Sequence, residues 1–99
     1  MKQYTPIKLD KIRNLRYGFA AIAKIEDRLD IGIAEINLNK IRLSQLATIV
    51  WAGLEHEDKN LSPEWVLETI DAYDLSLEEI GKAVGNSLTE AFQSEGKKK

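Results

Sequence analysis

The sequence predicts a mainly α fold, a single domain over residues 1–93 with about four helices and a short β-hairpin at residues 3–17. Three observations lead to this prediction. The chain has 99 residues, a length that suits one domain with one core. Hydrophobic residues make up 43% of it and charged residues 30%, an ordinary globular composition. Apolar residues also recur at helical spacing in several segments that polar residues separate.

The hairpin is predicted from two short runs, residues 3–9 and 12–17, on either side of Asp10 and Lys11. Both runs mix apolar and polar residues as short strands do. Pro6 has no backbone N–H to donate, so it places the first strand at the edge of the sheet. The turn lacks the glycine that tight hairpin turns usually contain.

The first helix is predicted to begin at Gly18 and to end at Leu29. One face of it carries Phe19, Ile22, Ala23, Glu26 and Leu29, with Ile25 beside that face. Residues 30–40, DIGIAEINLNK, combine apolar residues with a glycine and two asparagines. This composition favours a connector that places its apolar side chains under the core.

Glu26 and Asp27 are adjacent carboxylates in this first helix. Neighbouring residues on a helix point about 100° apart, so the pair cannot converge on one substrate atom as a general acid and base must. Glu26 lies on the apolar face. We therefore expect a structural role for it, bonded to a backbone N–H, to Arg16 or to Arg28.

The second and third helices each have a candidate N-terminal serine. Ser44 is the expected N-cap of the second helix. The apolar stripe of that helix is formed by Leu46, Ile49, Val50, Gly53 and Leu54. Ser62 and Pro63 are expected to open the third helix, because proline at the first helical position loses no hydrogen bond.

The fourth helix is predicted from a capping box formed by Ser76 and Glu79. Its apolar stripe continues through Gly85 to Phe92. Residues 94–99, SEGKKK, are expected to form a flexible charged tail.

No catalytic, cofactor-binding or metal site is predicted, and an enzyme is not expected. The chain has no cysteine, which excludes disulfides, thiolate metal sites and cysteine nucleophiles. His56 is the single histidine. Its acidic neighbours Glu55, Glu57 and Asp58 fan outward from a helix end instead of converging on a metal ion. The sequence contains no glycine-rich phosphate-binding loop.

Features of membrane-bound or exported proteins are also missing from the sequence. No apolar run approaches the roughly 20 residues of a membrane span, and the N-terminus lacks the apolar segment of a signal peptide. We expect a cytoplasmic protein without a membrane partner.

Charge is distributed unevenly along the chain. Residues 1–43 hold nine Lys and Arg against five acids, whereas residues 55–79 hold nine acids and only Lys59 as a cation. The two groups can pair within one chain, or between copies in a homo-oligomer. Alternatively, both are simply solvated faces.

Residues 76–92 admit an alternative function, a helix-turn-helix DNA-binding regulator with its turn near Gly85. A recognition helix presents cations and amides to phosphates and base edges. Here it would carry Glu90 and Glu95, with no Lys or Arg before Lys97. Such a helix repels a phosphate backbone, so nucleic-acid binding is disfavoured.

Trp51 and Trp65 are the candidate partner-binding residues. On an ideal helix each lies about 110° from the centre of its apolar stripe. Each therefore either fills a second side of a small core or anchors a partner protein, because exposed tryptophan is favoured at binding hot spots.

Two stretches carry a resemblance to a known family. They are LRYGF at residues 15–19 with Glu26, and VWAGL at residues 50–54 followed by LSPE at residues 61–64. With their surroundings, from Ile7 to Phe92, they resemble the tail assembly chaperones of long-tailed bacteriophages, prophages and gene-transfer particles. A prophage-encoded domain with a purely structural or inhibitory role is a further alternative.

The resemblance implies a small helical, non-enzymatic protein that acts in the host cytoplasm and is absent from the finished particle. Such proteins bind the tape-measure protein and deliver tail-tube subunits, without a cofactor. Family members are often made in two lengths by a ribosomal slip near the end of the short form, and Lys97, Lys98 and Lys99 fit such a site. A plain charged tail or a cloning remnant explains these lysines equally well.

Overall fold

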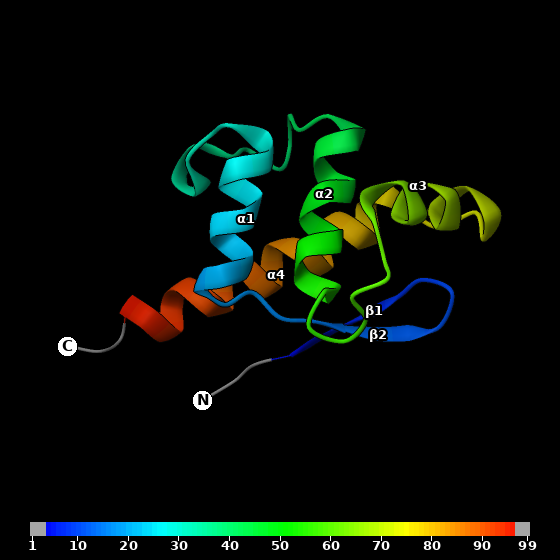
Figure 1. Ribbon diagram of the computed structural model, residues 1–99, viewed down its shortest axis with the longest axis horizontal. Helices are drawn as coiled ribbons and strands as arrows, with labels where there is room; N and C mark the ends of the chain where they lie inside the picture. Colours follow the sequence, from blue (N-terminus) through cyan, green and yellow to red (C-terminus); the bar gives the residue numbers. More distant parts are fainter. Residues whose placement is uncertain (1–3, 97–99) are drawn as a thin grey trace.

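The computed structural model describes the backbone of residues 4–96 and the side chains of residues 4–91. It confirms a mainly helical fold with an antiparallel N-terminal hairpin (Figure 1). The elements are β1 (Thr5–Lys8), β2 (Ile12–Leu15), α1 (Phe19–Leu29), the 3₁₀ turn η1 (Ile33–Glu35), α2 (Leu43–Leu54), α3 (Pro63–Ala72) and α4 (Leu77–Gly96). In Figure 1, α1 and α2 stand side by side, and the long α4 runs obliquely across the molecule behind them.

The hairpin forms although its turn contains no glycine. Ile7 pairs with Arg13 across the two strands, and the N–H of Leu9 donates to the carbonyl of Lys11 at 2.9 Å. The Arg13 guanidinium donates to both carboxylate oxygens of Asp10, at 2.8 and 2.9 Å. A bidentate pair of this kind has a specific geometry. It therefore stabilises this turn in place of the glycine that tight hairpin turns usually contain.

Helix α1 ends at Leu29, and the next residue, Asp30, caps it in the left-handed region with φ of 56°. Beyond it, the carboxylate of Glu26 accepts a hydrogen bond from the backbone N–H of Ile33 at 2.8 Å. The structure therefore confirms the structural role of Glu26 and selects a backbone N–H as its partner. The connector also behaves as predicted, because Ile33, Ile36 and Leu38 are partly buried against the core.

Helix α2 begins earlier than the sequence predicted. Its first residue is Leu43, so the prediction of Ser44 as the N-cap is wrong, and Ser44 is an exposed residue inside the first turn. The side chain of Gln45 accepts from the backbone N–H of Arg42 at 3.0 Å. This contact satisfies a backbone donor at the start of the helix, and it needs no serine.

Helix α2 is also the centre of the core. Every residue from Leu46 to Leu54 except Thr48 is buried. The helix contacts α1, α3, α4 and β2, so it is enclosed on several sides. A helix that is apolar over most of its circumference is the expected central element of a small domain.

The starts of α3 and α4 follow the predicted serine caps. The hydroxyl of Ser62 accepts from the N–H of Trp65 at 3.0 Å, and Pro63 is the first residue of α3. The hydroxyl of Ser76 accepts from the N–H of Glu79 at 3.2 Å, which is one half of the predicted capping box. Between the two helices the chain turns at Asp74, with φ of 52°.

Helix α4 is continuous through Gly85 and extends to Gly96. Residues 94–96, which were predicted to belong to a flexible tail, are therefore helical. Residues 97–99, the lysines of the suggested slip site, lie outside the described part of the chain.

Candidate functional site

Trp51 belongs to the core. Only 5% of it is exposed, and its indole N–H donates to the carbonyl of Leu61 at 3.0 Å. The cations of Lys24 and Arg28, both from α1, lie 5.3 and 4.6 Å from the ring centroid. The geometry therefore matches the core interpretation, because a partner could reach this ring only by displacing α1 side chains.

Trp65 is partly buried and packs against the same core. The guanidinium of Arg13 lies 4.8 Å from its ring centroid, a distance at which cation–π attraction operates. Arg13 is itself buried and held by Asp10. The hydrogen bonds from Arg13 lower the pKa of the Asp10 carboxyl below its usual value, so the pair stays charged and fastens the hairpin turn to α3.

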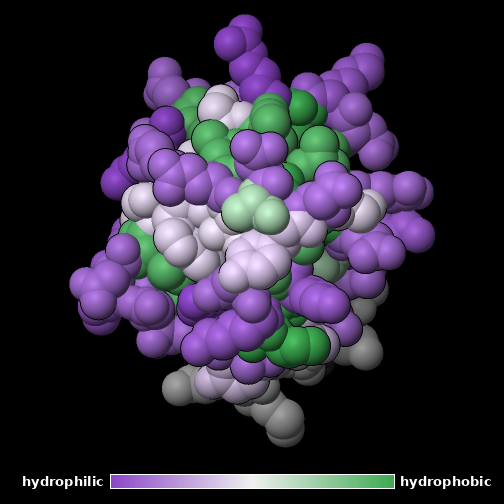
Figure 2. All heavy atoms as spheres, turned by 90° about the vertical axis from the view of Figure 1, so that its right-hand side faces the viewer, coloured by the Kyte–Doolittle hydropathy of each residue, from purple (hydrophilic) through white to green (hydrophobic). Residues whose placement is uncertain are grey.

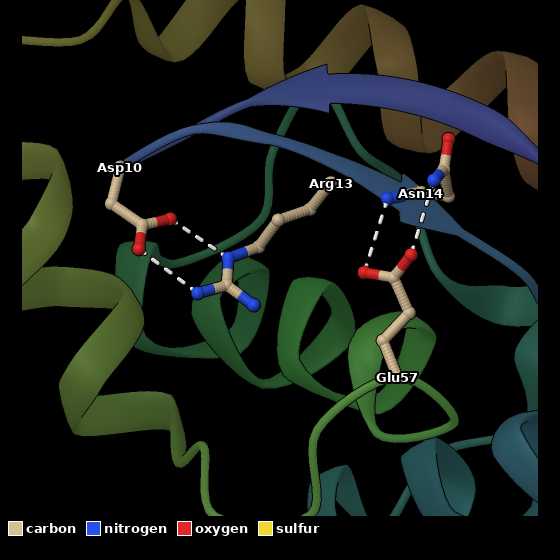
Figure 3. A network of polar contacts seen from close by, with 4 residues as sticks. All are labelled: Asp10, Arg13, Asn14 and Glu57. Carbon is tan, nitrogen blue, oxygen red and sulfur yellow. Dashed lines mark hydrogen bonds and ion pairs between the residues drawn. The ribbon is translucent and has the colours of Figure 1, made fainter.

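The polar loop after α2 fastens that end of the helix to β2. His56 shares a hydrogen bond of 2.8 Å between its Nε2 and the carbonyl of Asn14, and because a carbonyl only accepts, Nε2 must carry the proton. The carboxylate of Glu57 accepts from the backbone N–H and the side-chain amide of Asn14, at 3.4 and 3.1 Å. Figure 3 shows this contact and the Asp10–Arg13 pair.

Of the acidic residues around His56, Glu57 is thus bonded to Asn14. Among the residues that the structure describes, no group of three His, Asp or Glu side chains is arranged to hold a metal. In the same part of the chain, no helix combines the length and the apolar character needed to cross a membrane.

Only some charges of the basic N-terminal part and the acidic middle pair with each other inside the molecule. Lys24 forms an ion pair with Glu55, which joins the basic N-terminal part to the acidic middle. The other acids of the middle are mostly solvated. Those exposed on α3, α4 and the turn between them are Glu64, Glu68, Asp71, Asp74, Glu78 and Glu79.

One apolar surface lies among those acids. We define the α3–α4 corner as Tyr73 and Leu77, which are 56% and 46% exposed, together with Asp71, Asp74 and Glu78. Figure 2 shows the end of the molecule that includes the end of α3, with a central patch of white and green spheres surrounded by hydrophilic residues. In the corner, two exposed apolar side chains thus lie close in sequence to three exposed acids.

A second apolar surface lies between α1 and the end of α2. A cavity of about 370 Å³ opens there. We define the α1 pocket by six of its lining residues, which are Arg16, Phe19, Lys24, Ala52, Glu55 and Lys59. Phe19 is 74% exposed, and large apolar residues with that exposure are candidates for contact with another molecule.

The exposure of Phe19 corrects the predicted inner face of α1. Ile25 is the fully buried residue of that helix, and Phe19 lies six residues before it, about 120° away around the helix axis. Ala23 is exposed as well. If the apolar stripe of α1 is centred on Ile25, and not on Phe19 and Glu26, Phe19 falls at the surface. The sequence therefore contained a signal for the exposure of Phe19.

The helix-turn-helix alternative meets two obstacles in the structure. Residues 77–96 form one helix, so no turn is present at Gly85. The exposed side chains of α4 include Glu78, Glu79 and Glu90, which would face a phosphate backbone with like charge.

Among the residues that the structure describes, we take two surfaces as candidate sites for protein binding, one concave with a basic lining and the other centred on Tyr73 and Leu77 among acidic neighbours. Comparisons with protein-family models, with curated proteins and with solved structures find no match for this chain.

Proposed function

We propose that this protein is a non-enzymatic tail assembly chaperone that binds the tape-measure protein, the tail-tube protein or both in the cytoplasm of the host cell. One observation carries the proposal. Phe19, Tyr73 and Leu77 are large apolar side chains that remain exposed, whereas Trp51 is buried and Trp65 is partly buried against the core. The resemblance of the sequence to phage tail assembly chaperones supplies the identity of the clients.

The physical requirements of such a chaperone are modest. It must offer apolar contacts to a partner that would otherwise aggregate, inside a charged surface that keeps the complex in solution. Its 30% of charged residues and net charge of −2 suit that task. It needs no reactive group, and it leaves before the particle is complete.

Co-expression tests this proposal directly. The chain is produced together with the tape-measure or tail-tube protein encoded beside it, and the soluble fraction of each client is measured. We expect the wild-type chain to raise that fraction, and Phe19→Ser or Leu77→Ser to reduce the gain. Leu43→Ser is the matched control, because Leu43 is 47% exposed but belongs to neither surface. Equal solubility of both clients with and without the chain would refute the chaperone proposal.

Association between copies is a separate proposal about partners. The basic N-terminal part and the acidic middle of the chain have opposite charge, so contacts between these regions of different copies would be heterologous and would either close into a ring or propagate from copy to copy. Light scattering at increasing protein concentration measures this association, and a constant monomer mass at low salt would exclude it.

A further inference from the structure

We propose that the α1 pocket is the docking site for an acidic amphipathic helix of a partner protein. The inference rests on the proposed function to the extent that the pocket is one of the two client-binding surfaces. It adds the chemistry of the segment that is bound, which the resemblance does not supply.

The charges of the pocket select an acidic occupant. Its lining carries three cations, Arg16, Lys24 and Lys59, against one carboxylate, Glu55. Lys24 is neutralised by its ion pair with Glu55. Within residues 4–91, neither Arg16 nor Lys59 forms an ion pair with a carboxylate. The pocket therefore presents two uncompensated positive charges on a chain whose net charge is −2.

The apolar part of the pocket selects an amphipathic occupant. Phe19 stands at the surface with 74% of its area exposed, and the alanines Ala20, Ala21 and Ala52 complete the apolar lining. Such an arrangement suits a helix that places an apolar row on Phe19 and the alanines, and carboxylates beside Arg16 and Lys59. A purely acidic segment would leave the ring of Phe19 in water.

The pocket walls are held by contacts that exist without a ligand. The N–H of Arg16 donates to the carbonyl of Gly53 at 2.9 Å, which fixes the start of α1 against α2. Lys24 and Glu55 join α1 to the end of α2 across the pocket, and His56 ties the following loop to β2. A preformed site loses less conformational freedom on binding than a flexible one.

The α3–α4 corner of a second copy is a less suitable occupant. Tyr73 follows the end of α3 and Leu77 begins α4, so the two side chains are not on one helix and do not form an apolar row at helical spacing. The cavity of about 370 Å³ has room for side chains only. The corner is part of a folded domain, so its two apolar side chains cannot rearrange into a row that would fit the pocket. We therefore assign the pocket to a helix of a different protein and treat self-association as a result that would overturn the assignment.

The test uses a pair of fluorescently labelled helical peptides of about 20 residues, long enough to be helical in water. Both carry the same apolar row at i, i+4 and i+7, and they differ in having either glutamate or lysine at the polar positions. Fluorescence anisotropy measures binding to the full chain. We expect the acidic peptide to bind at least tenfold more tightly than its basic twin, and added salt to reduce the difference.

Variants locate the binding site. Phe19→Ser is expected to weaken binding of the acidic peptide about tenfold, as loss of a hot-spot aromatic does, and Arg16→Glu combined with Lys59→Glu should have a similar effect. The matched controls are Tyr73→Ser, an exposed aromatic outside the pocket, and Lys82→Glu, an exposed lysine on α4. Circular dichroism of every variant checks that the fold is retained.

Several outcomes would overturn the inference. They are equal binding of the two peptides, equal loss of binding in the controls, and a self-association of the wild-type chain that Phe19→Ser abolishes. The result is independent of the co-expression test. If clients are solubilised but the acidic peptide does not bind, the pocket assignment fails and the chaperone proposal stands. If the peptide binds but no client is solubilised, the chaperone proposal fails instead.

Discussion

Tyr17 and Phe19 are separated by one glycine, and they have opposite places in the molecule. Tyr17 is buried, its hydroxyl donates to the carbonyl of Ile49 at 2.8 Å, and burial raises the pKa of that hydroxyl far above its usual value. Phe19 is 74% exposed. The first aromatic anchors the junction of β2 and α1 on α2. Because that anchor fixes where α1 begins, the second aromatic is held at the surface beside the pocket.

The strongest test of this contrast is to remove each ring. We expect Tyr17→Ala to lower the free energy of unfolding by about 3 to 5 kcal/mol, as loss of a buried aromatic ring does. Phe19→Ala should change it by no more than about 0.5 kcal/mol, because an exposed side chain makes few contacts. Urea denaturation followed by far-ultraviolet circular dichroism measures both values. Similar losses for the two variants would mean that Phe19 is part of the core.

A second test concerns the space that Tyr17 occupies. A Cβ at Gly53 would lie 2.6 Å from Cζ of Tyr17 and 2.8 Å from its hydroxyl oxygen. We expect Gly53→Ala to destabilise the protein by about 1 to 3 kcal/mol through overpacking, although alanine favours a helix. The control is Gly81→Ala, where a Cβ meets no atom within 4 Å. There we expect a gain of about 0.5 to 1 kcal/mol, and a gain at Gly53 as well would show that the ring moves freely.

A third test separates the ring of Tyr17 from its hydroxyl. Tyr17→Phe removes the hydrogen bond to Ile49 and keeps the packing, so we expect a loss of about 1 kcal/mol. Tyr73→Phe removes an exposed hydroxyl and should have almost no effect. Thermal unfolding of both variants and of the wild type measures these losses. If Tyr17→Phe is as stable as the wild type, the ring alone stabilises this junction and the hydroxyl contributes nothing.

The smallest expected effect concerns the other anchor of the hairpin, the pair formed by Asp10 and Arg13. Because the pKa of Asp10 is lowered in the folded protein, the pair contributes its full stability above the unfolded pKa of 3.8. That contribution is lost as the pH falls through the lowered folded value. Asp10→Asn should therefore cost about 0.5 kcal/mol near neutral pH, and the cost should shrink below pH 3.8. Urea unfolding across this range measures it, and a cost independent of pH would contradict the assignment.

Local signals explain the parts of the fold that could be predicted. Ser62 and Pro63 define the start of α3 through contacts within one helical turn, and the change from strand to helical periodicity near Gly18 locates the start of α1. The start of α2 was misplaced because Ser44 and Gln45 both offer side-chain oxygens to backbone donors. The longer side chain of Gln45 reaches back to Arg42, and a pattern of residue types does not decide such a competition.

The candidate site was harder to predict, because exposure depends on contacts between distant segments. Trp51 and Trp65 were ambiguous in the sequence. Lys24 and Arg28 approach Trp51 from α1, and Arg13 approaches Trp65 from the hairpin. No spacing within α2 or α3 contains that information.

The sequence by itself determined the helical class, the hairpin, most helix boundaries and the structural role of Glu26, since these depend on periodicity and on hydrogen bonds between near neighbours. Only the tertiary structure decided which aromatic rings are covered and where uncompensated cations gather. Burial and charge pairing are properties of surfaces that meet in space. These surfaces meet because several elements pack on α2, and those elements come from distant parts of the chain.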